Sequence, residues 1–593
     1  MSKSRTPSLS IEALEDRTTP STLIALTGNN QLLRFDSATP NTIQSTLAIT
    51  GLGANETVRG IDFRPRTGQL IASTVTTGSV SNSIVRTYSV NALTGAATFI
   101  GASASLSGAA DVPGGYDFNP TVDRLRYVNT NDLNVRINPN NGTLAGVDTG
   151  LTPAVSEDII GEAYDRNFDR QNNAGDVGTL PTTLYAINRI GSQLARQGGV
   201  DGVPSPNGGV ITNIGPLGVT LDAAADGGFD ITSDGKAFAA LTSGGTTRLY
   251  TINLVSGAAS LVDTIGNGAT GVNSLTAVPV STLVVGADAG GVAAIQVRVA
   301  FTGAITNTFN PFPGFGGGVR VASGDVNRDG IADVVAAAGP GGGPIITVFD
   351  GTNGAVLYTF FAFDSGFRNG AEVAVGDVNR DGFQDIIAGA GIGGAPHVKV
   401  FSGRDLSVLS SFFAYDAGFR GGVRVASGDF NLDGTDEIVT VAGPGGGPHV
   451  RIFDGLGAPF VSAALPNLSN SFFSYDGSVR NGGYLAVGDV NGDGAPDIVT
   501  GPDTGDVAHV KVFSGRDTSL LASFFAFATS IRTGARVAVA DFNADGRGEI
   551  LAAVGPGVDS TIRTFDDLTL AQLDDFSAFP GFIGGVFVGG SRS

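Results

Sequence analysis

Hydrophobic residues along this chain come in short runs that are separated by turns rich in Gly, Pro, Asn and Asp. Residues 397–401 (HVKVF) alternate apolar and polar side chains, and residues 385–388 (DIIA) form a brief apolar run. Alternation is typical of a strand with one buried face, and a short apolar run between turns is typical of a buried strand. No long stretch repeats its apolar residues at helical spacing. The pattern predicts an almost wholly β protein.

The second half of the chain repeats itself. An acidic loop that begins Asp325-Val-Asn-Arg-Asp-Gly recurs in steps of 52, 52, 60 and 52 residues, and the longer step carries an insertion around residues 458–468. Each unit joins an aromatic cluster, which we place at its start (residues 360–363, FFAF), to further short strands. Four short strands in about 50 residues is the pattern of one propeller blade.

The two ends of this array complement each other. Residues 281–308 resemble the second half of a unit, and residues 576–589 resemble the first half. With the five complete units they predict a propeller of about six blades, closed by strands from both ends of the array. Such closure removes the sheet edge that would otherwise remain exposed.

A weaker repeat covers residues 22–280. Its units begin with Gly60-Ile61-Asp62-Phe63 and with related motifs at Gly115, Gly161 and Gly228. Residues 23–26 open in the middle of a unit and residues 272–276 begin another, so we expect about five blades here. The sequence therefore predicts two β-propellers in tandem, 22–280 and 281–593, with an extended loop pair over residues 165–210.

Residues 1–21 lie outside both arrays, and we expect a disordered segment. Residues 11–20 resemble an N-terminal sorting-like motif of large bacterial surface or secreted proteins. The segment lacks the apolar centre of an ordinary secretory signal.

Composition narrows the classes of function. The net charge of −20 argues against a nucleic-acid partner, since such proteins carry basic patches that neutralise phosphates. The chain has no Cys, which excludes disulfides, thiolate catalysis and Cys-ligated metal sites. It also has no apolar run long enough to cross a bilayer as a helix, so we predict no transmembrane segment.

The acidic loops predict calcium sites. Oxygen-bearing side chains occupy loop positions 1, 3, 5 and 9, Gly occupies position 6, and position 7 varies freely. Calcium takes six to eight oxygen ligands, Gly permits the sharp turn, and a backbone carbonyl at position 7 would explain the variation there. The alternatives are Asx turns without a metal, or Mg²⁺ in a more rigid site. The predicted Ca²⁺ ligands are Asp325, Asn327, Asp329, Asp333; Asp377, Asn379, Asp381, Asp385; Asp429, Asn431, Asp433, Glu437; Asp489, Asn491, Asp493, Asp497; Asp541, Asn543, Asp545 and Glu549.

With these loops and the motif Gly394-Ala395-Pro396, residues 281–593 resemble the FG-GAP repeats of integrin α-subunit propellers and related bacterial surface proteins. The resemblance implies a propeller fold, calcium at the loop residues, and roles in adhesion or ligand recognition. Integrin propellers have seven blades whereas we count six, so the binding face is not carried over. Residues 22–280 resemble a bacterial family known as domain of unknown function 4394, which brings no function.

Other recurring side chains have structural explanations. We expect His397, His449 and His509, which share one repeat position, to bond to the adjacent loop. Two basic sets could form a binding ring for an acidic glycan, but we expect them to pair with carboxylates between blades. These sets are Arg320, Arg424, Arg536 and Lys399, Arg451, Lys511, Arg563.

The sequence carries no enzyme signature, and we predict no catalytic residues. We expect a secreted or cell-surface calcium-binding protein of a bacterium that binds a protein or glycan ligand, for example in adhesion. Extracellular modules bind calcium at roughly 10⁻⁴–10⁻³ M, a level suited to sites that fill outside the cell. The alternative is an extracellular propeller enzyme that acts on polysaccharide or phosphate esters with carboxylate chemistry.

Overall fold

The computed structural model describes residues 21–592, with gaps at 55, 77–83, 107–111, 154–157, 168–181, 280, 301–302, 543–545 and 568. The predicted N-terminal segment, except residue 21, and two predicted ligands, Asn543 and Asp545, lie outside the described residues. Within this part of the chain the protein is all-β, with two short 3-10 helices and no α-helix. The all-β prediction is confirmed.

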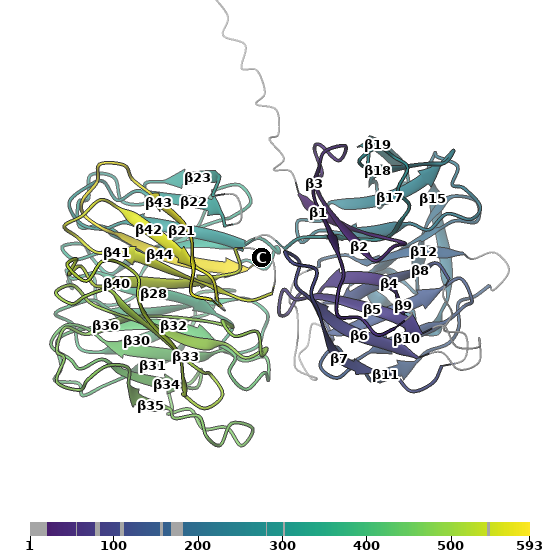
Figure 1. The fold of residues 1–593 in the computed structure, drawn as a ribbon. Coiled ribbons are helices and arrows are strands. Elements are labelled where there is room, and N and C mark those ends of the chain that lie inside the picture. Colours follow the sequence, from purple (N-terminus) through teal and green to yellow (C-terminus); the bar gives the residue numbers. More distant parts are fainter. Residues whose placement is uncertain are drawn as a thin grey trace, which may run out of the picture.

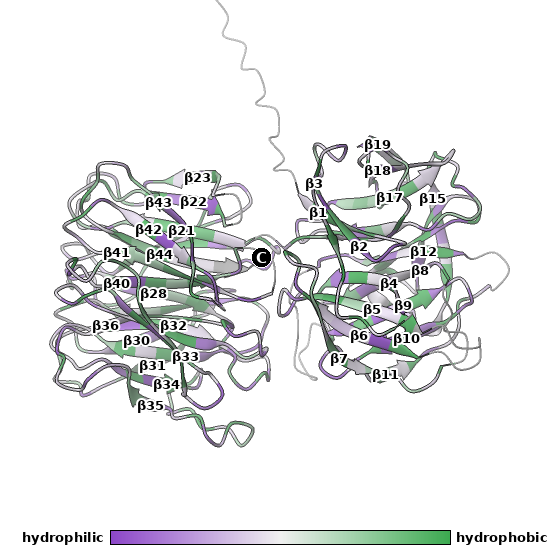
Figure 2. Ribbon diagram, in the orientation of Figure 1, coloured by the Kyte–Doolittle hydropathy of each residue, from purple (hydrophilic) through white to green (hydrophobic). Residues whose placement is uncertain are grey.

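The described strands form eleven four-stranded antiparallel sheets. Five sheets lie between residues 22 and 277, which we call the N-terminal unit, and six lie between residues 281 and 592, the C-terminal unit. Figure 1 shows the two sets of sheets as separate bodies side by side. In Figure 2 hydrophobic stretches fall on the strands of both units.

The elements of the N-terminal unit are β1 (Thr22–Thr27), β2 (Gln31–Asp36), β3 (Ile43–Ala48), β4 (Glu56–Phe63), β5 (Leu70–Thr76), β6 (Val85–Val90), β7 (Ala97–Ala102), β8 (Gly114–Asn119), β9 (Arg124–Asn129), β10 (Asn134–Ile137), β11 (Leu144–Val147), β12 (Ile159–Tyr164), β13 (Leu184–Asn188), β14 (Gln193–Gln197), η1 (Val200–Gly202), η2 (Pro206–Gly208), β15 (Ile211–Pro216), β16 (Gly228–Ile231), β17 (Ala237–Ser243), β18 (Thr246–Ile252), β19 (Ala259–Thr264) and β20 (Val272–Ala277).

The strands of the C-terminal unit are β21 (Ser281–Ala287), β22 (Ile295–Val299), β23 (Ile305–Phe309), β24 (Val319–Gly324), β25 (Asp333–Ala338), β26 (Ile345–Phe349), β27 (Val356–Phe361), β28 (Ala371–Gly376), β29 (Asp385–Ala390), β30 (His397–Phe401), β31 (Val408–Phe413), β32 (Val423–Gly428), β33 (Glu437–Ala442), β34 (His449–Phe453), β35 (Ser471–Phe473), β36 (Gly483–Gly488), β37 (Asp497–Pro502), β38 (His509–Phe513), β39 (Leu520–Phe525), β40 (Ala535–Ala540), β41 (Glu549–Val554), β42 (Thr561–Phe565), β43 (Gln572–Ser577) and β44 (Val586–Arg592).

Each sheet runs from an inner strand to an outer strand. The second strand, such as β25 (DVVAAA), is wholly buried, whereas the fourth, such as β27 (VLYTFF), mixes exposed and half-buried residues. The hydrophobic cores lie between neighbouring sheets, where apolar side chains from one sheet pack on those of the next. A strand with both faces covered reads as an apolar run, and an outer strand reads as alternation.

One sheet in each unit joins strands from distant parts of the chain. β20 pairs with β1 in the N-terminal unit, and β44 pairs with β21 in the C-terminal unit, in register from Ser281↔Arg592 to Ala287↔Val586. The sequence predicted this pairing of the ends.

The inner strands of successive sheets contact one another in a cycle. In the N-terminal unit β4, β8, β12, β16 and β20 follow in order and β20 returns to β4; in the C-terminal unit β24, β28, β32, β36, β40 and β44 do the same, with β44 contacting β24.

Two details differ from the sequence prediction. The aromatic clusters close a sheet instead of opening one: Phe360 lies next to the last residue of β27 and packs on Phe401 of the next sheet, with 4.8 Å between ring centroids. Residues 165–210, predicted as an extended loop pair, contain β13 and β14, which pair in one sheet. Both strands are short and flanked by polar residues. The alternation of apolar and polar side chains within them is therefore difficult to recognise in the surrounding polar sequence.

Candidate functional site

The predicted calcium loops all occupy the same place in their sheets. Each one connects the first strand to the second, so that Asp325 follows β24 and Asp333 begins β25. Because the five loops join equivalent strands, they gather at one end of the C-terminal unit. This is the end at which the inner strands finish.

Within the first loop, side-chain oxygens bend the backbone around themselves. The N–H of Asp329 donates to Oδ1 of Asp325 (3.0 Å) and to Oδ1 of Asn327 (2.9 Å), and the N–H of Gly330 donates to Oδ2 of Asp325 (2.8 Å). Gly330 has a φ of 89°, a conformation that glycine adopts readily. Positions 1, 3 and 5 are therefore drawn together.

The carboxylate at position 9 ties the loop to the rest of its sheet. Oδ2 of the fully buried Asp333 accepts the N–H groups of Val326 (2.8 Å) and Asn327 (3.1 Å), and Oδ1 accepts the N–H of Gly351 (2.9 Å) beyond the third strand. A carboxylate offers about four acceptor positions, so these bonds leave about one for a metal ion.

The same bonds recur in the other loops. The glycine at position 6 donates to Oδ2 of the aspartate at position 1 over 2.7–3.0 Å in each of them. These pairs are Gly382–Asp377, Gly434–Asp429, Gly494–Asp489 and Gly546–Asp541.

The loop carboxylates lie in surroundings that disfavour their charge. Burial raises the pKa of Asp325 to about 6 and that of Asp333 to about 7, and neighbouring loop carboxylates add to both shifts. Burial likewise raises the pKa values of Asp377 to about 7, Asp385 to about 8, Glu437 to about 9 and Asp497 to about 7. A divalent cation at the loop would stabilise the charged form.

The donor chemistry of the loops fits calcium. Their side chains supply carboxylate and amide oxygens, the hard donors that calcium prefers, although no three carboxylates of a described loop lie within 4.8 Å of one another. In each loop whose residues are described, the structure brings the side chains of positions 1, 3 and 5 together. The first aspartates of four loops (Asp377, Asp429, Asp489 and Asp541) also line one cavity of about 350 Å³.

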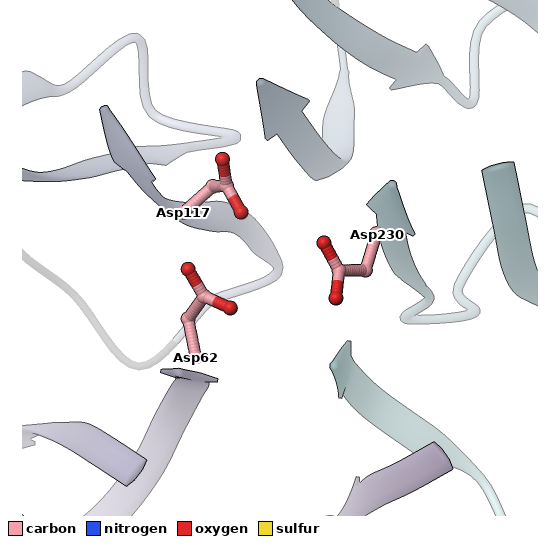
Figure 3. Close-up of side chains that lie close together, drawn as sticks. All are labelled: Asp62, Asp117 and Asp230. Carbon is pink, nitrogen blue, oxygen red and sulfur yellow. The ribbon is translucent and has the colours of Figure 1, made fainter. Parts of the chain in front are cut away.

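A second acidic cluster, which the sequence analysis did not identify, lies inside the N-terminal unit. Asp62 of β4, Asp117 of β8 and Asp230 of β16 point toward one another (Figure 3) and are at most 2% exposed. One oxygen from each lies within 4.8 Å of the others, and among the described residues no other group of three acidic, His or Cys side chains meets this condition. The distance would allow one cation to contact all three carboxylates.

The same aspartates join neighbouring inner strands. Oδ2 of Asp62 accepts the N–H of Phe118 on β8 (2.8 Å), and Oδ2 of Asp117 accepts the N–H of Tyr164 on β12 (2.7 Å). Oδ2 of Asp230 accepts the N–H of Ala277 on β20 (2.6 Å). Each carboxylate thus satisfies a buried backbone donor of the next sheet.

Protonation of this cluster is favoured. Burial raises the pKa of Asp62 to about 6, and it raises the pKa values of Asp117 and Asp230 well above the usual range, with the nearby carboxylates adding to the shift. The signal was present in the sequence: all three aspartates take the same position in the weak repeat. Equivalent positions of inner strands meet at the centre of a cyclic arrangement.

The recurring histidines contact the adjacent strand rather than a loop. Nε2 of His397, His449 and His509 each lies 2.8 Å from a serine Oγ on the neighbouring outer strand. Aromatic rings flank them, with Phe413 4.8 Å from His397.

The basic residues divide into two groups. Arg320, Arg424 and Arg536 pair with the carboxylates of Glu372, Asp503 and Asp288 respectively, as predicted. Three members of the second set instead donate to backbone carbonyls: Arg451 to Ala414 O (2.6 Å), Lys511 to Ser474 O (3.0 Å) and Arg563 to Ala526 O (3.0 Å). Arg563 also lies 3.9 Å from the carboxylate of Asp575, which belongs to the same sheet.

Family models match segments of both units. Four-stranded sheets and repeated acidic loops define a propeller-like all-β protein with FG-GAP repeats. Residues 369–404 match the FG-GAP repeat model, residues 489–552 match the FG-GAP-like repeat model, and residues 31–276 match Domain of unknown function (DUF4394). Both resemblances noted in the sequence are thereby confirmed.

The solved structures that match this chain resemble it only weakly. A protein of unknown function from Bacteroides caccae matches with 12% identity and a TM-score of 0.36, over 53% of this chain and 100% of its own. Raptor from Chaetomium thermophilum matches with 13% identity and a TM-score of 0.31, over 49% of this chain and 23% of its own. No curated protein matches the sequence. Within the described residues, no helix has the length and apolar character needed to cross a membrane.

Proposed function

We propose that this protein is an extracellular or cell-surface calcium-binding module of a bacterium, built from a five-bladed and a six-bladed propeller, that binds a protein or glycan ligand and catalyses no reaction. The cyclic contacts between inner strands support the two propellers, because every sheet then has a neighbour on each side. The pairing of β44 with β21 supports closure by both ends of the array.

One observation carries the calcium assignment. In the first four loops, buried carboxylates gather whose charge is poorly compensated, since burial is the largest influence on their pKa values. Loops of this kind are stable with charged carboxylates only if cations lie among them. Calcium would then rigidify the connection between the first two strands of each blade.

The proposed location follows from the same chemistry. Calcium sites in extracellular modules have dissociation constants of roughly 10⁻⁴–10⁻³ M and fill at extracellular calcium concentrations. A rigid propeller presents its connecting loops at fixed positions, which suits binding of a large ligand. FG-GAP repeats support a binding role in preference to catalysis.

Calcium titration tests the proposal. We expect metal-free protein to bind several calcium ions in isothermal titration calorimetry and to melt at a higher temperature with calcium than with chelator. Each site filled tenfold above its dissociation constant contributes about 1.4 kcal/mol. Asp381→Asn should remove one site, whereas Asp416→Asn, at an exposed residue outside the loops, should remove none.

A protein that bound no calcium and melted at the same temperature in both conditions would refute the calcium assignment. A screen of polysaccharides and phosphate esters tests the absence of catalysis. Turnover that persisted in chelator and survived repurification would point to the enzymatic alternative.

A further inference from the structure

A turn of the N-terminal unit reaches into the acidic end of the C-terminal unit. Residues 64–69 connect β4 to β5, and Arg66 lies at the tip of this turn. Arg66 Nη2 is 3.0 Å from Oδ2 of Asp429, which is position 1 of the third calcium loop. The two side chains are only 16% and 17% exposed, so the ion pair is largely removed from solvent.

The turn is held in place by the N-terminal unit itself. Arg64, two residues before Arg66, binds both carboxylate oxygens of Asp123 on the neighbouring sheet, and both side chains are buried. The N–H of Gly68 closes the turn by donating to the carbonyl of Arg64 (2.8 Å). Arg66 is therefore presented in a fixed direction, with little entropy lost on docking.

The turn of residues 64–69 also contacts a second acidic loop of the C-terminal unit. A methyl group on Gly546, at position 6 of the fifth loop, would lie 2.7 Å from Cα of Gln69. The backbone of the turn thus packs directly on this loop, and the glycine leaves room for it. Contact with two loops fixes the turn across the acidic end of the C-terminal unit.

The cavity under the turn is strongly acidic. Asp377, Asp429, Asp489, Asp541 and Asp436 line it, together with Arg66. A guanidinium and a calcium ion are both attracted by such a cavity. They also repel each other strongly when they share one carboxylate in partly desolvated surroundings.

We propose that Arg66 and calcium compete for the Asp429 loop, so that docking of the N-terminal unit and calcium binding at this loop oppose each other. The proposal rests on the calcium binding proposed above. By linkage, the factor by which Arg66 weakens calcium at this loop equals the factor by which calcium weakens docking. Calcium that fills the third loop releases the N-terminal unit, whereas Arg516, beside Asp493 of the fourth loop, belongs to the C-terminal unit, so its displacement leaves docking unchanged.

The first measurement is a calcium titration of the full chain. Arg66→Gln should strengthen binding at one site about tenfold or more, because a cation next to the ion is removed. The matched control is Arg516→Gln, which removes an arginine 3.1 Å from Asp493 of the fourth loop: it should strengthen calcium binding at that loop and leave the contact between the units unchanged.

The second measurement is the distance between the units. The chain has no Cys, so spin labels can be placed specifically at Val255→Cys and Val461→Cys, both highly exposed and in different units. With chelator, pulsed dipolar spectroscopy should give one narrow distance, and excess calcium should broaden or shift it. With Arg66→Gln the distribution should be broad in both conditions, and with Arg516→Gln it should follow the wild type.

Two results would overturn the proposal, and they differ. The proposed competition between Arg66 and calcium would be refuted if wild type and Arg66→Gln bound calcium with the same constants and the label distance did not change with calcium. The calcium sites themselves would still be supported by that result. If neither chain bound calcium, the proposed function would fail as well. Arg66→Lys, which retains the charge, should lie closer to wild type than Arg66→Gln and so guards against a general loss of structure.

Discussion

At the scale of single residues, buried aspartates have the same structural role in both units: they accept hydrogen bonds from backbone N–H groups. In the acidic loops and in the cluster of Asp62, Asp117 and Asp230, carboxylate oxygens accept backbone N–H groups that would otherwise be buried without a partner. Leaving such a donor unsatisfied costs about 1–3 kcal/mol. The two settings differ in surroundings, because the loops are partly open to solvent and the cluster is enclosed by strands.

The buried cluster makes the stability of the N-terminal unit depend on pH. The pKa of Asp62 is about 6 in the folded chain, above its unfolded value of about 3.9, so folding favours the protonated form. Its contribution is complete below about pH 4 and is lost as the pH rises through about 6, by about 2–3 kcal/mol. Asp62→Asn should make this slope shallower between pH 4 and 7 in calorimetry with chelator present, and Asp117 and Asp230, whose pKa values are also raised, should supply the rest.

Asp263→Asn, at an exposed aspartate of β19, serves as the control for loss of a negative charge. Equal slopes for Asp62→Asn and wild type would show that Asp62 does not titrate in this range. If added calcium abolished the wild-type slope but left that of Asp62→Asn unchanged, the cluster would be a metal site.

At the scale of strands and sheets, glycines on the inner strands determine how closely neighbouring sheets approach each other. Four inner strands of the N-terminal unit carry a glycine where the next strand contacts them, at Gly60, Gly115, Gly161 and Gly228. In the fifth, Ser274 takes this place and its Oγ accepts the N–H of Ile61 (3.2 Å). A side chain at any of the four glycines would enter the adjacent strand.

Adding one methyl group at this contact should be costly. In Gly60→Ala the new Cβ would lie 2.2 Å from Cγ of Tyr116, so sheets β4–β7 and β8–β11 would have to separate. We expect a loss of about 1–3 kcal/mol in the free energy of unfolding, measured by denaturant titration. Gly271→Ala, where the Cβ would meet nothing within 4 Å, should be neutral. Equal stabilities for the two variants would argue against the role of this contact.

Features local in sequence could be predicted, and features that depend on assembly could not. The loops at Asp325 and its equivalents are visible because their ligands lie within nine residues and recur. The cluster at Asp62 joins residues far apart in the chain, and only the cyclic order of strands brings them together. The contact of Arg66 with Asp429 spans two units, so no repeat pattern contains it.

Each unit depends as a whole on a sheet composed of strands from both of its ends. Removing residues 586–593 should expose the edge of β21 and the partners of Val586 and Phe587, which are at most 6% exposed. We expect a loss of about 3–6 kcal/mol from these side chains alone, with aggregation through the open edge. Thermal melts and size-exclusion chromatography measure both effects.

A peptide with the sequence of residues 584–593 should restore the melting temperature, and a scrambled peptide should not. Unchanged stability after truncation would mean that β44 does not close the C-terminal unit.

The same sheets impose an order on biosynthesis. About 245 residues separate the end of β1 from the start of β20, so at about 5–20 residues per second the ribosome makes β1 roughly 12–50 s before its partner. Hairpin neighbours such as β4 and β5 emerge almost together and can pair while translation continues. In each unit the composite sheet is therefore the last to form, and the nascent chain presents one waiting strand to chaperones throughout that interval.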